Sequence, residues 1–447
     1  MRDPLRADMP YEAWPSAKSS LEPSKRQGRQ VTVVGVRIVS TMNPILGADM
    51  TTYQYLIVGG GMAADSAARG IRDIDKKGSI AILSADVDAP YPRPALSKKL
   101  WTDPEFTWDQ VDLATVADTG AELRLGTEVL SIDRDDKTVL TASGQVFGYQ
   151  KLLLVTGLTP SRIDDDGDAV LYFRSARDYQ QLRALAQPGH QFVVVGGGYI
   201  GLEAAAVAST LGLRVTLVEA TSRILQRVAA PQTSDYFRAL HAGRGVEVLE
   251  ATGLLGMEAL PGGTIAAHLG DGRTQVADFV IVGIGVVPND ALAAKAGLAC
   301  DGGIVVDAQG RTSDPTIWAA GDCARFPWRG QSIRLESVQN AIDQAEAVAA
   351  NILGAGRDYA AQPWFWSDQY DVKLQIAGLN AGYDHVAVRA GAGPARSHWY
   401  FRGSELLAID AMNDPRAYMV GKRLIEAGRS PRPAQVADAD TDLKALL

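Results

Sequence analysis

The sequence predicts an α/β protein built from two Rossmann-like units, followed by a smaller α+β domain at the C-terminal end. Two observations predict the units: near residue 55 and again near residue 192, a short apolar run leads into a glycine-rich turn and then a helical pattern. A third observation predicts the last domain, because short alternating runs precede one helical pattern from Pro363 onward. Repeated strand–turn–helix–strand order is typical of parallel sheets.

The first unit begins with an apolar strand at Tyr55 to Val58, continues through GGGMAADSAARGIR, and returns to a strand at Ile80 to Leu83. Its turn has the GxGxxG/A spacing at Gly59, Gly61 and Ala64. In a dinucleotide site the first Gly makes the tight turn, the second lets the backbone approach the pyrophosphate, and the third small residue lets helix and strand pack. Such a turn can also serve helix packing alone, and its place between strand and helix favours the dinucleotide site.

The second unit repeats this order between residues 192 and 218, and its turn matches the motif fully with Gly196, Gly198 and Gly201. Glu219 ends the following strand, at the spacing expected for a carboxylate that binds an adenosine ribose 2′-OH. Beside a 2′-phosphate this charge would cost roughly 1 to 4 kcal/mol per charge pair. NADH is therefore favoured over NADPH, although Arg223 nearby weakens the preference.

Further strands and helices connect the units. A β-meander is expected at Val129 to Tyr149 and a strand at Lys151 to Val155, which leads into Thr156-Gly157. After the second unit we expect, in order, a hairpin at Thr264 to Val276, a strand at Asp278 to Val282, two short strands from Gly303, and a helix at Ser337 to Leu353. The tail predicts strands at Lys373 to Ala377, His385 to Val388, His398 to Phe401 and Leu406 to Ile409, then a helix near Ala417 to Ala427.

Composition limits the function classes. The formal net charge of -8 argues against general affinity for nucleic acid. The two cysteines, Cys300 and Cys323, exclude a disulfide scaffold, a four-cysteine zinc site and a CxxC redox pair, and they suit a reducing cytoplasm; no metal site is expected. No apolar run approaches the roughly 18 residues of a membrane span. Residues 1–50, with several prolines and scattered charges, predict a disordered extension. A targeting peptide fits less well than a non-essential extension or a misassigned start, with Met50 as the natural beginning.

Two such units in one chain, together with Thr156-Gly157 and a late Gly321-Asp322, resemble the flavoproteins that have two dinucleotide-binding domains. The segments PYPRPALSKKLW, GGGYIGLEAA, GIGVVPN, RLESVQNAIDQA, PWFWSDQY and NDPRAYMVGKRLI are similar to the FAD-dependent NADH:ferredoxin reductases of the putidaredoxin reductase-like family, which is related to apoptosis-inducing factor. The resemblance covers the chain from Tyr53 to its end.

The resemblance implies a discontinuous FAD-binding domain at 51–160 and 287–361, an NAD-binding domain at 162–286 and a C-terminal α+β domain at 362–447. It implies an enzyme that passes electrons from NADH through FAD to a [2Fe-2S] ferredoxin-type acceptor, as a cytoplasmic monomer or weak homodimer. The nicotinamide is expected within about 3.5 Å of flavin N5. Open alternatives are another acceptor, such as rubredoxin, a quinone or oxygen, and a non-catalytic, NADH-regulated interaction module.

The resemblance also implies site residues. Lys98 is expected beside flavin N5 and paired with Glu203, where a cation stabilises the reduced ring; the other possibility for Lys98 is a solvated surface lysine. The expected cofactor-binding residues are Gly59, Gly61, Ala63, Ala64, Asp86, Arg93, Lys98, Val129, Thr156, Gly157, Arg162, Gly321, Asp322, Val338, Trp366, Gly196, Gly198, Tyr199, Ile200, Gly201, Glu219 and Gly285.

Some residues depart from the family pattern or allow a second interpretation. Ala85 stands where relatives have a carboxylate for the FAD ribose, with Asp86 one position later, and Ser161 displaces an arginine to Arg162. Trp364, Phe365 and Trp366 could equally form interdomain core, and Cys323 is expected to pack. The basic residues of the tail, from Arg389 to Arg432, suggest a positive surface for an acidic ferredoxin, or else a scattered solvated face.

Overall fold

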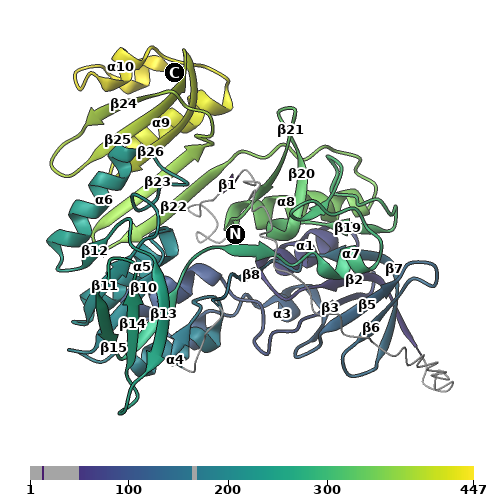
Figure 1. Cartoon of the computed structure of the whole chain (residues 1–447). Helices are drawn as coiled ribbons and strands as arrows, with labels where there is room; N and C mark the ends of the chain where they lie inside the picture. The colour runs from purple at the N-terminus through teal and green to yellow at the C-terminus, as the bar shows by residue number, and fades with distance from the viewer. Residues whose placement is uncertain (1–12, 15–49, 164–168) are drawn as a thin grey trace, which may run out of the picture.

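The computed structural model describes residues 13–14, 50–163 and 169–447. The three largest of the six sheets in these residues organise the fold. Figure 1 shows the C-terminal sheet above the second sheet, with the first sheet beside them. The predicted α/β class is confirmed.

The first sheet has the order β4-β3-β2-β7-β6-β5, with β19 also paired to β7. Its central pairs β2–β3 and β2–β7 are parallel, and β5, β6 and β7 form the predicted antiparallel meander. The last strand of the meander and the strand expected after it are one long strand, β7, whose residues pair with β6 on one side and with β2 on the other. The strands are β2 (Thr51–Val58), β3 (Ile80–Leu83), β4 (Glu122–Arg124), β5 (Val129–Asp133), β6 (Thr138–Thr141), β7 (Val146–Leu154) and β19 (Ile317–Ala319).

Helices α1 (Met62–Ile74) and α8 (Val338–Ile352) pack against each other and cover one face of this sheet with small apolar side chains. Gly70 shows how closely they approach, because a Cβ there would lie 2.9 Å from that of Ala349. The remaining elements of this part are α2 (Lys99–Thr102), α3 (Thr115–Thr119), α7 (Ala291–Lys295), β18 (Ile304–Val305), β20 (Ala324–Trp328), β21 (Gln331–Leu335) and the 3-10 turns Arg93–Ser97, Trp108–Gln110 and Gly321–Cys323.

The second sheet is parallel, with the order β12-β11-β10-β16-β9. The hairpin expected at 264–276 is part of a three-stranded antiparallel sheet whose first strand, β13, lacks a clear alternation of buried and exposed residues. The elements are β9 (Val170–Leu171), α4 (Ala176–Leu185), β10 (Gln191–Val195), α5 (Tyr199–Thr210), β11 (Arg214–Val218), α6 (Pro231–Gly243), β12 (Glu247–Leu249), β13 (Leu254–Ala259), β14 (Ile265–Leu269), β15 (Thr274–Ala277) and β16 (Phe279–Val282).

Two antiparallel segments connect these sheets. β8 (Leu158–Pro160) leaves the first sheet and β17 (Val286–Pro288) returns to it. The chain therefore crosses between the two nucleotide-type units twice, at one place.

The C-terminal sheet is antiparallel, with the order β22-β23-β26-β25-β24. Its four predicted strands and its helix are confirmed, and β22 was not predicted as a strand because its aromatic residues also suited core packing. Phe365 of β22 packs against the cores of both the first and the second sheets. The elements are β22 (Trp364–Gln369), β23 (Val372–Gly378), β24 (His385–Ala390), β25 (Arg396–Arg402), β26 (Glu405–Met412), α9 (Pro415–Glu426), α10 (Pro433–Ala437) and a 3-10 turn at Leu443–Leu446.

The predicted disordered extension, 1–50, lies almost wholly outside the described residues. Of it, β1 (Ala13–Trp14) pairs antiparallel with β21. Across the part of the chain that the structure describes, we find no helix with the length and apolar character that a bilayer crossing requires.

Candidate functional site: two glycine turns and a shared cavity

The two glycine turns are built alike. Gly59 has φ +122°, and a Cβ there would lie 2.2 Å from the carbonyl oxygen of Val155; Gly196 has φ +107°, and its Cβ would lie 2.4 Å from that of Gly283. Only glycine fits such contacts at positive φ. The first glycine of each turn is therefore required by the packing of the protein itself.

The second glycine of each turn has a different environment. At Gly61 and Gly198 an added Cβ would meet no protein atom within 4 Å. Both residues are N-caps without a side-chain cap, so the first backbone N–H groups of α1 and α5 face open space. Those groups and the helix dipole favour an anionic ligand such as a diphosphate.

The first turn opens into a cavity of about 580 Å³, within the range of cofactor sites. It is lined by residues from all three parts of the chain. The predicted site residues among them are Gly59, Gly61, Ala63, Asp86, Arg93, Lys98, Thr156, Gly157, Ile200, Glu203, Asp322, Val338 and Trp366. The cavity is also lined by four residues that the sequence analysis did not single out, Ser97, Arg174, Asn289 and Glu336. All but Arg174 lie in segments quoted for the family resemblance, which was the signal that could have found them.

Seven predicted residues do not line either cavity. Ala64 is fully buried in the helix–strand contact, and Gly321 packs against Ala63. Gly201 packs within the second turn, where a Cβ would lie 2.1 Å from the carbonyl oxygen of Gly196. The remaining four are Val129 on β5, Arg162 stacked 4.5 Å from the Tyr172 ring centroid, Tyr199 packed 4.7 Å from the Phe365 ring, and Gly285 beside the second crossing segment.

Lys98 and Glu203 form a buried ion pair at the inner end of the cavity, with Lys98 Nζ 2.6 Å from Glu203 Oε2. The side chain of Glu203 is 1% exposed and that of Lys98 13%, so the interpretation of Lys98 as a solvated surface lysine is wrong. Ser97 Oγ donates to the same carboxylate oxygen at 2.7 Å, and Ser367 Oγ donates to Oε1 at 2.7 Å. A buried ion pair is tolerated when such additional hydrogen bonds satisfy its lone pairs.

Trp366 of β22 lies next to this pair. Lys98 Nζ is 5.0 Å from the centroid of its ring, and the indole Nε1 donates to Asp368. Burial raises the pKa of Asp368, and the positive charge of Lys98 opposes that shift. Trp366 therefore belongs to the site. Phe365 also lines the cavity, and it packs against two hydrophobic cores as well, whereas Trp364 packs in hydrophobic cores alone.

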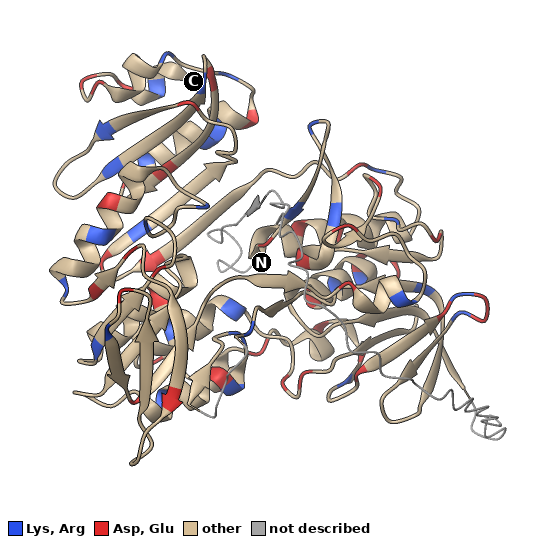
Figure 2. Cartoon of the chain, viewed as in Figure 1, with Lys and Arg blue, Asp and Glu red and all other residues tan. Residues whose placement is uncertain are grey.

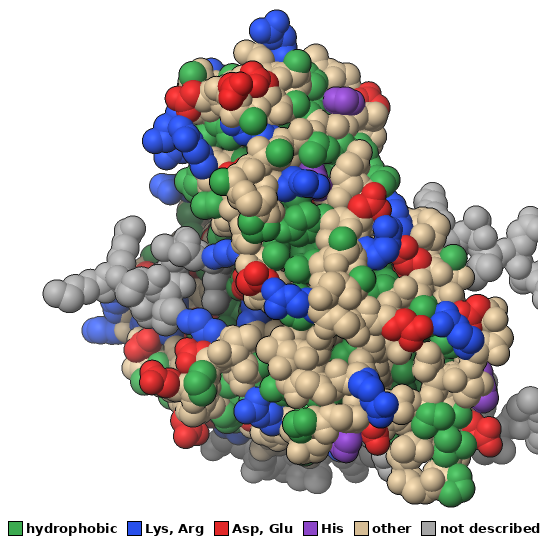
Figure 3. Space-filling model, turned by 90° about the vertical axis from the view of Figure 1, so that its left-hand side faces the viewer, with side chains coloured by type: hydrophobic (Ala, Val, Ile, Leu, Met, Phe, Trp, Pro, Cys, Tyr) green, Lys and Arg blue, Asp and Glu red, His purple; other side chains and the backbone are tan. Residues whose placement is uncertain are grey.

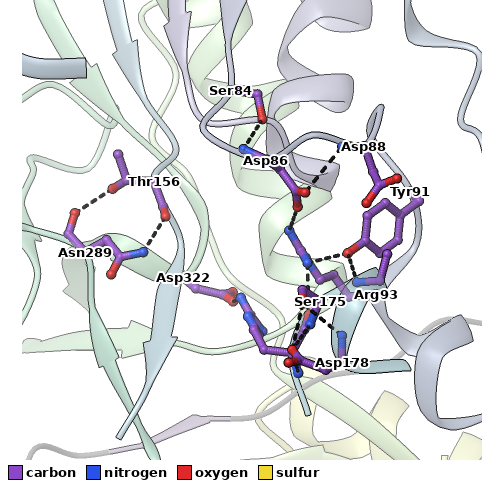
Figure 4. A network of polar contacts seen from close by, with 12 residues as sticks. Ser84, Asp86, Asp88, Tyr91, Arg93, Thr156, Ser175, Asp178, Asn289 and Asp322 are labelled. Atoms are coloured by element: carbon purple, nitrogen blue, oxygen red, sulfur yellow. Dashed lines mark hydrogen bonds and ion pairs between the residues drawn. The ribbon is translucent and has the colours of Figure 1, made fainter. Parts of the chain in front are cut away.

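A polar network lines the cavity near the first turn (Figure 4). Asp86 accepts from Arg93 Nη2 at 3.1 Å, and Arg93 Nη1 also donates to Tyr91 Oη and to the carbonyl oxygen of Arg174. Asp86 lines the cavity together with Ala85 and Ser84. The carboxylate of Asp86, which stands one position after the family's carboxylate, thus reaches the cavity. One of its oxygens already accepts a hydrogen bond from Arg93.

Asp322 also lines the cavity (Figure 4), and its Oδ1 accepts from the backbone N–H of Ser337 at 3.0 Å. Burial raises the pKa of Asp322, and Arg174, whose Nη2 lies 3.8 Å away, opposes that shift. Burial likewise raises the pKa of Glu336. Acceptors in this position suit the hydroxyl groups of a ligand.

The second turn opens into a cavity of about 230 Å³ that Gly196, Gly198 and Glu219 line. Glu219 Oε2 accepts from the N–H of Gly197 at 2.7 Å, and Oε1 accepts from the N–H and hydroxyl groups of Thr221. The carboxylate is therefore held at the end of β11, beside the turn.

The comparisons with known proteins agree with this geometry. The family described as pyridine nucleotide-disulphide oxidoreductase matches residues 53–345, and the family described as reductase C-terminal matches residues 364–447. The chain belongs to this oxidoreductase family. An FAD-dependent, nicotinamide-dependent enzyme is thereby confirmed.

Three relatives illustrate the similarity. A 5,5′-dehydrodivanillate O-demethylase ferredoxin reductase subunit from Sphingobium sp. is 38% identical over 89% of this chain and 99% of its own length. A putidaredoxin reductase from Pseudomonas putida is 37% identical over 88% of this chain and 96% of its own. A crystal structure of a covalent putidaredoxin reductase–putidaredoxin complex superposes with a TM-score of 0.84 at 35% identity, covering 88% of this chain and 98% of that one.

The cavity residues fit the FAD of the pyridine nucleotide-disulphide oxidoreductases. The open backbone at Gly61 would accept a diphosphate at the N-terminus of α1, and Asp86, Asp322 and Lys98 offer two acceptors and a cation along the cavity. Redox chemistry would come from the bound flavin. Cys323 is fully buried, as expected, with Sγ 3.7 Å from the carbonyl oxygen of Leu154, and burial raises the pKa of its thiol.

The C-terminal part of this family member does not carry the positive excess that the basic residues suggested. Residues 364–447 contain ten basic and ten acidic side chains. Figures 2 and 3 show both signs intermixed over this part. Several of the basic groups hold the chain together: Arg389 donates to the carbonyl oxygens of Val436, Ala439 and Thr441, and Arg416 pairs with Asp442 at 2.6 Å. The equal numbers of basic and acidic side chains favour the alternative of a scattered solvated face, and docking of an acidic ferredoxin on this part stays a prediction.

Proposed function

We propose that the protein transfers a hydride from NADH to an FAD held in the 580 Å³ cavity and passes electrons to a [2Fe-2S] ferredoxin-type protein. The observation that carries the proposal is the composition of that cavity. Ile200 and Glu203 on helix α5, which starts at the second glycine turn, line it together with Gly59 and Lys98 of the first unit. A nicotinamide bound along α5 would thus meet a flavin bound along α1.

In this proposal each residue acts by binding or by charge. The backbone of Gly61 and the N-terminus of α1 bind the FAD diphosphate, Asp322 accepts from the ribityl chain, and Lys98 supplies a cation at the flavin ring. Glu203 keeps Lys98 in place. No nucleophile of the protein is required, because orientation and electrostatic stabilisation are sufficient for hydride transfer between bound rings.

Glu219 supports NADH over NADPH. Its carboxylate lines the second cavity, where an added 2′-phosphate would meet a like charge. Arg223, which could have offset that charge, donates to Ser234 Oγ at 2.6 Å and to the carbonyl oxygen of Gln226. Arg227 lines the cavity, and we propose that it binds the diphosphate group of NADH.

We further propose that residues 51–160 and 287–361 form the FAD-binding domain, 162–286 the NAD-binding domain and 362–447 the C-terminal domain. The crossing segments β8 and β17 lie at the boundary between the FAD-binding and NAD-binding domains. The proposal also includes a cytoplasmic protein that is monomeric or weakly dimeric, which sedimentation at two protein concentrations would test.

The test is anaerobic stopped-flow mixing of the FAD-loaded protein with NADH and, separately, with NADPH. We expect rapid bleaching of the flavin by NADH, slower bleaching by NADPH, and cytochrome c reduction that depends on an added [2Fe-2S] ferredoxin. Replacing Glu219 with Ser and Thr221 with Arg should shift the preference toward NADPH. Bleaching that takes minutes would instead favour an NADH-regulated interaction module, and reduction that needs rubredoxin, a quinone or oxygen would identify another acceptor.

A further inference from the structure

Glu203 is the end of a buried hydrogen-bond chain that continues away from the cavity. Ser367 Oγ donates to Glu203 Oε1 at 2.7 Å, Gln369 Nε2 donates to Ser367 Oγ at 3.1 Å, and His241 Nε2 lies 2.8 Å from Gln369 Oε1. Tyr370 Oη lies 3.3 Å from the other ring nitrogen, Nδ1. Ser367, Gln369 and His241 are all 0% exposed, so none of them contacts bulk solvent.

The periodicities of a helix and a strand explain how this chain is assembled. On α5, Tyr199 and Glu203 are four residues apart, about 6 Å along the axis. On β22, Phe365 and Ser367 are two residues apart, which spans nearly the same length on one face. Tyr199 therefore packs on Phe365, and Glu203 accepts a hydrogen bond from Ser367. Gln369 is the next residue on the same face of β22, and its side chain forms a hydrogen bond with His241 of α6.

The charge of Glu203 fixes the direction of every hydrogen bond in the chain. An ionised carboxylate only accepts, so the single proton of the Ser367 hydroxyl must point to it. Ser367 must then accept from the amide group of Gln369, which turns the amide oxygen toward His241. His241 must therefore carry its proton on Nε2 and leave Nδ1 as an acceptor, and burial supports a neutral ring because it lowers the pKa of His241 to about 4.

We propose that Ser367, Gln369 and His241 are positioning residues for the flavin site, which hold Glu203 as a carboxylate with Oε2 turned to Lys98. Ser367 is the donor that reaches Oε1 within the described residues, whereas Oε2 is shared by Lys98 and Ser97. The C-terminal sheet thereby sets the position of the Lys98 cation in a cavity formed mainly by the other two parts. The kinetic consequence rests on the proposed function; the direction of the chain does not.

The first experiment measures the tautomer of His241 in the FAD-loaded protein by ¹⁵N NMR of labelled histidine. The polypeptide has five histidines, and the signal that is missing from the spectrum of His241→Gln is assigned to His241. In the unchanged protein we expect the Nε2–H form. In Glu203→Gln the new amide can donate to Ser367, so the chain can reverse and the proton should move to Nδ1 of His241.

Two other side chains separate Glu203 from His241, so a merely structural role for the chain would not move that proton. An Nδ1–H form in the unchanged protein, or no change of tautomer in Glu203→Gln, would overturn the proposal. This readout needs no electron transfer, and it remains decisive even if NADH fails to bleach the flavin, which would contradict the proposed function alone.

The second experiment measures flavin bleaching by NADH in Ser367→Ala. We expect the rate constant to fall about tenfold, the effect of losing one hydrogen bond to a buried charge, while Ser367→Thr retains most of it. Ser397→Ala is the matched control, because Ser397 is equally buried in the same sheet but accepts from Trp399. If Ser367→Ala fails to fold, Gln369→Met breaks the chain one step further out with the same expectation. Equal rate constants of flavin bleaching in Ser367→Ala, or in Gln369→Met where that replaces it, and in Ser397→Ala would refute the positioning role.

Discussion

At the scale of single residues, the buried Lys98–Glu203 pair is the most informative feature of the molecule. Two oppositely charged groups lose much hydration on burial, and their mutual attraction compensates only when other hydrogen bonds complete the geometry. Ser97 and Ser367 supply those bonds to Glu203, whereas the ammonium of Lys98 faces the cavity and the ring of Trp366. In the proposed function, this cation lies where negative charge would develop on a flavin.

Replacing Lys98 with Met tests that role. Glu203 would keep its two hydroxyl donors, but the cavity would lose its cation, so we expect the rate constant of flavin bleaching by NADH to fall about a hundredfold. Lys99→Met is the control, because Lys99 is exposed and its Nζ lies 5.5 Å from the ring of Phe106. Stopped-flow absorbance at the flavin band measures both variants, and similar rates would contradict the assignment.

His241 predicts a pH dependence of stability. Burial lowers its pKa from 6.5 to about 4, so between these values the unfolded chain binds a proton that the folded protein does not. Stability from this residue is therefore present above pH 6.5 and is lost as the pH falls toward 4, by about 1.4 kcal/mol per pH unit in the middle of the window. Urea unfolding of the protein and of His241→Gln at pH 5 and pH 7 should show a smaller loss in the variant. An equal loss would show that the histidine is accessible to protons.

At the scale of elements, the two strand–turn–helix units show why a glycine motif has two separate physical causes. The first glycine in each turn lies against a carbonyl oxygen of the neighbouring segment, and the second faces empty space at a helix N-terminus. Packing of the protein therefore requires the first glycine, whereas the second has room that, in the proposed function, a ligand would fill.

Gly59→Ala and Gly61→Ala should accordingly fail in different ways. We expect Gly59→Ala to destabilise the apoprotein by several kcal/mol, since its Cβ would lie 2.2 Å from the Val155 carbonyl oxygen at a φ of +122°. Gly61→Ala should keep the thermal midpoint of the apoprotein and weaken FAD binding, because the methyl group would enter the cavity. Differential scanning calorimetry of apoprotein and titration with FAD separate the two effects. A stable Gly59→Ala apoprotein would contradict this explanation.

The sequence predicted the elements that have a strong period or a fixed turn, and it missed those whose position depends on distant partners. Both glycine units and four strands of the C-terminal sheet were predicted, since alternation and turn residues are local signals. β22 was not, because its residues contact three different cores and follow no simple alternation. Among site residues, Lys98 and Glu203 were predicted from the family resemblance. The roles of Ser97 and Ser367 were not, because these residues lie 106 and 164 positions from Glu203 in the sequence and only the folded structure shows their hydrogen bonds to it.

At the scale of the whole molecule, the site exists only where three parts meet. The cavity takes Lys98 from the first part, Glu203 from the second and Trp366 from the C-terminal sheet. The first two parts are joined by the crossing segments β8 and β17, so the distance between a flavin and a nicotinamide depends on how rigid that crossing is. A displacement of about 1 Å between reacting groups can cost a hundredfold in rate.

Asn289 holds this crossing together from both sides. Its Nδ2 donates to the carbonyl oxygen of Thr156 at 2.8 Å, and its own carbonyl oxygen accepts from Thr156 Oγ1 at 2.6 Å (Figure 4). Its Oδ1 also accepts from Thr159 Oγ1 at 2.7 Å. The side chain thus links the outgoing segment to the returning one.

Replacing Asn289 with Ala should loosen the crossing while leaving the backbone bonds. We expect a loss of about 1 to 3 kcal/mol in stability and roughly a tenfold slower bleaching of the flavin by NADH, because the two rings would be held less well. Asn351→Ala is the control: Asn351 makes comparable side-chain bonds to Gln309 and Arg357, all within the first part, so its loss should lower stability without slowing bleaching. Urea unfolding and stopped-flow absorbance on both variants separate the effects, and equal bleaching rates at equal loss of stability would show that the crossing does not control the distance between the cofactors.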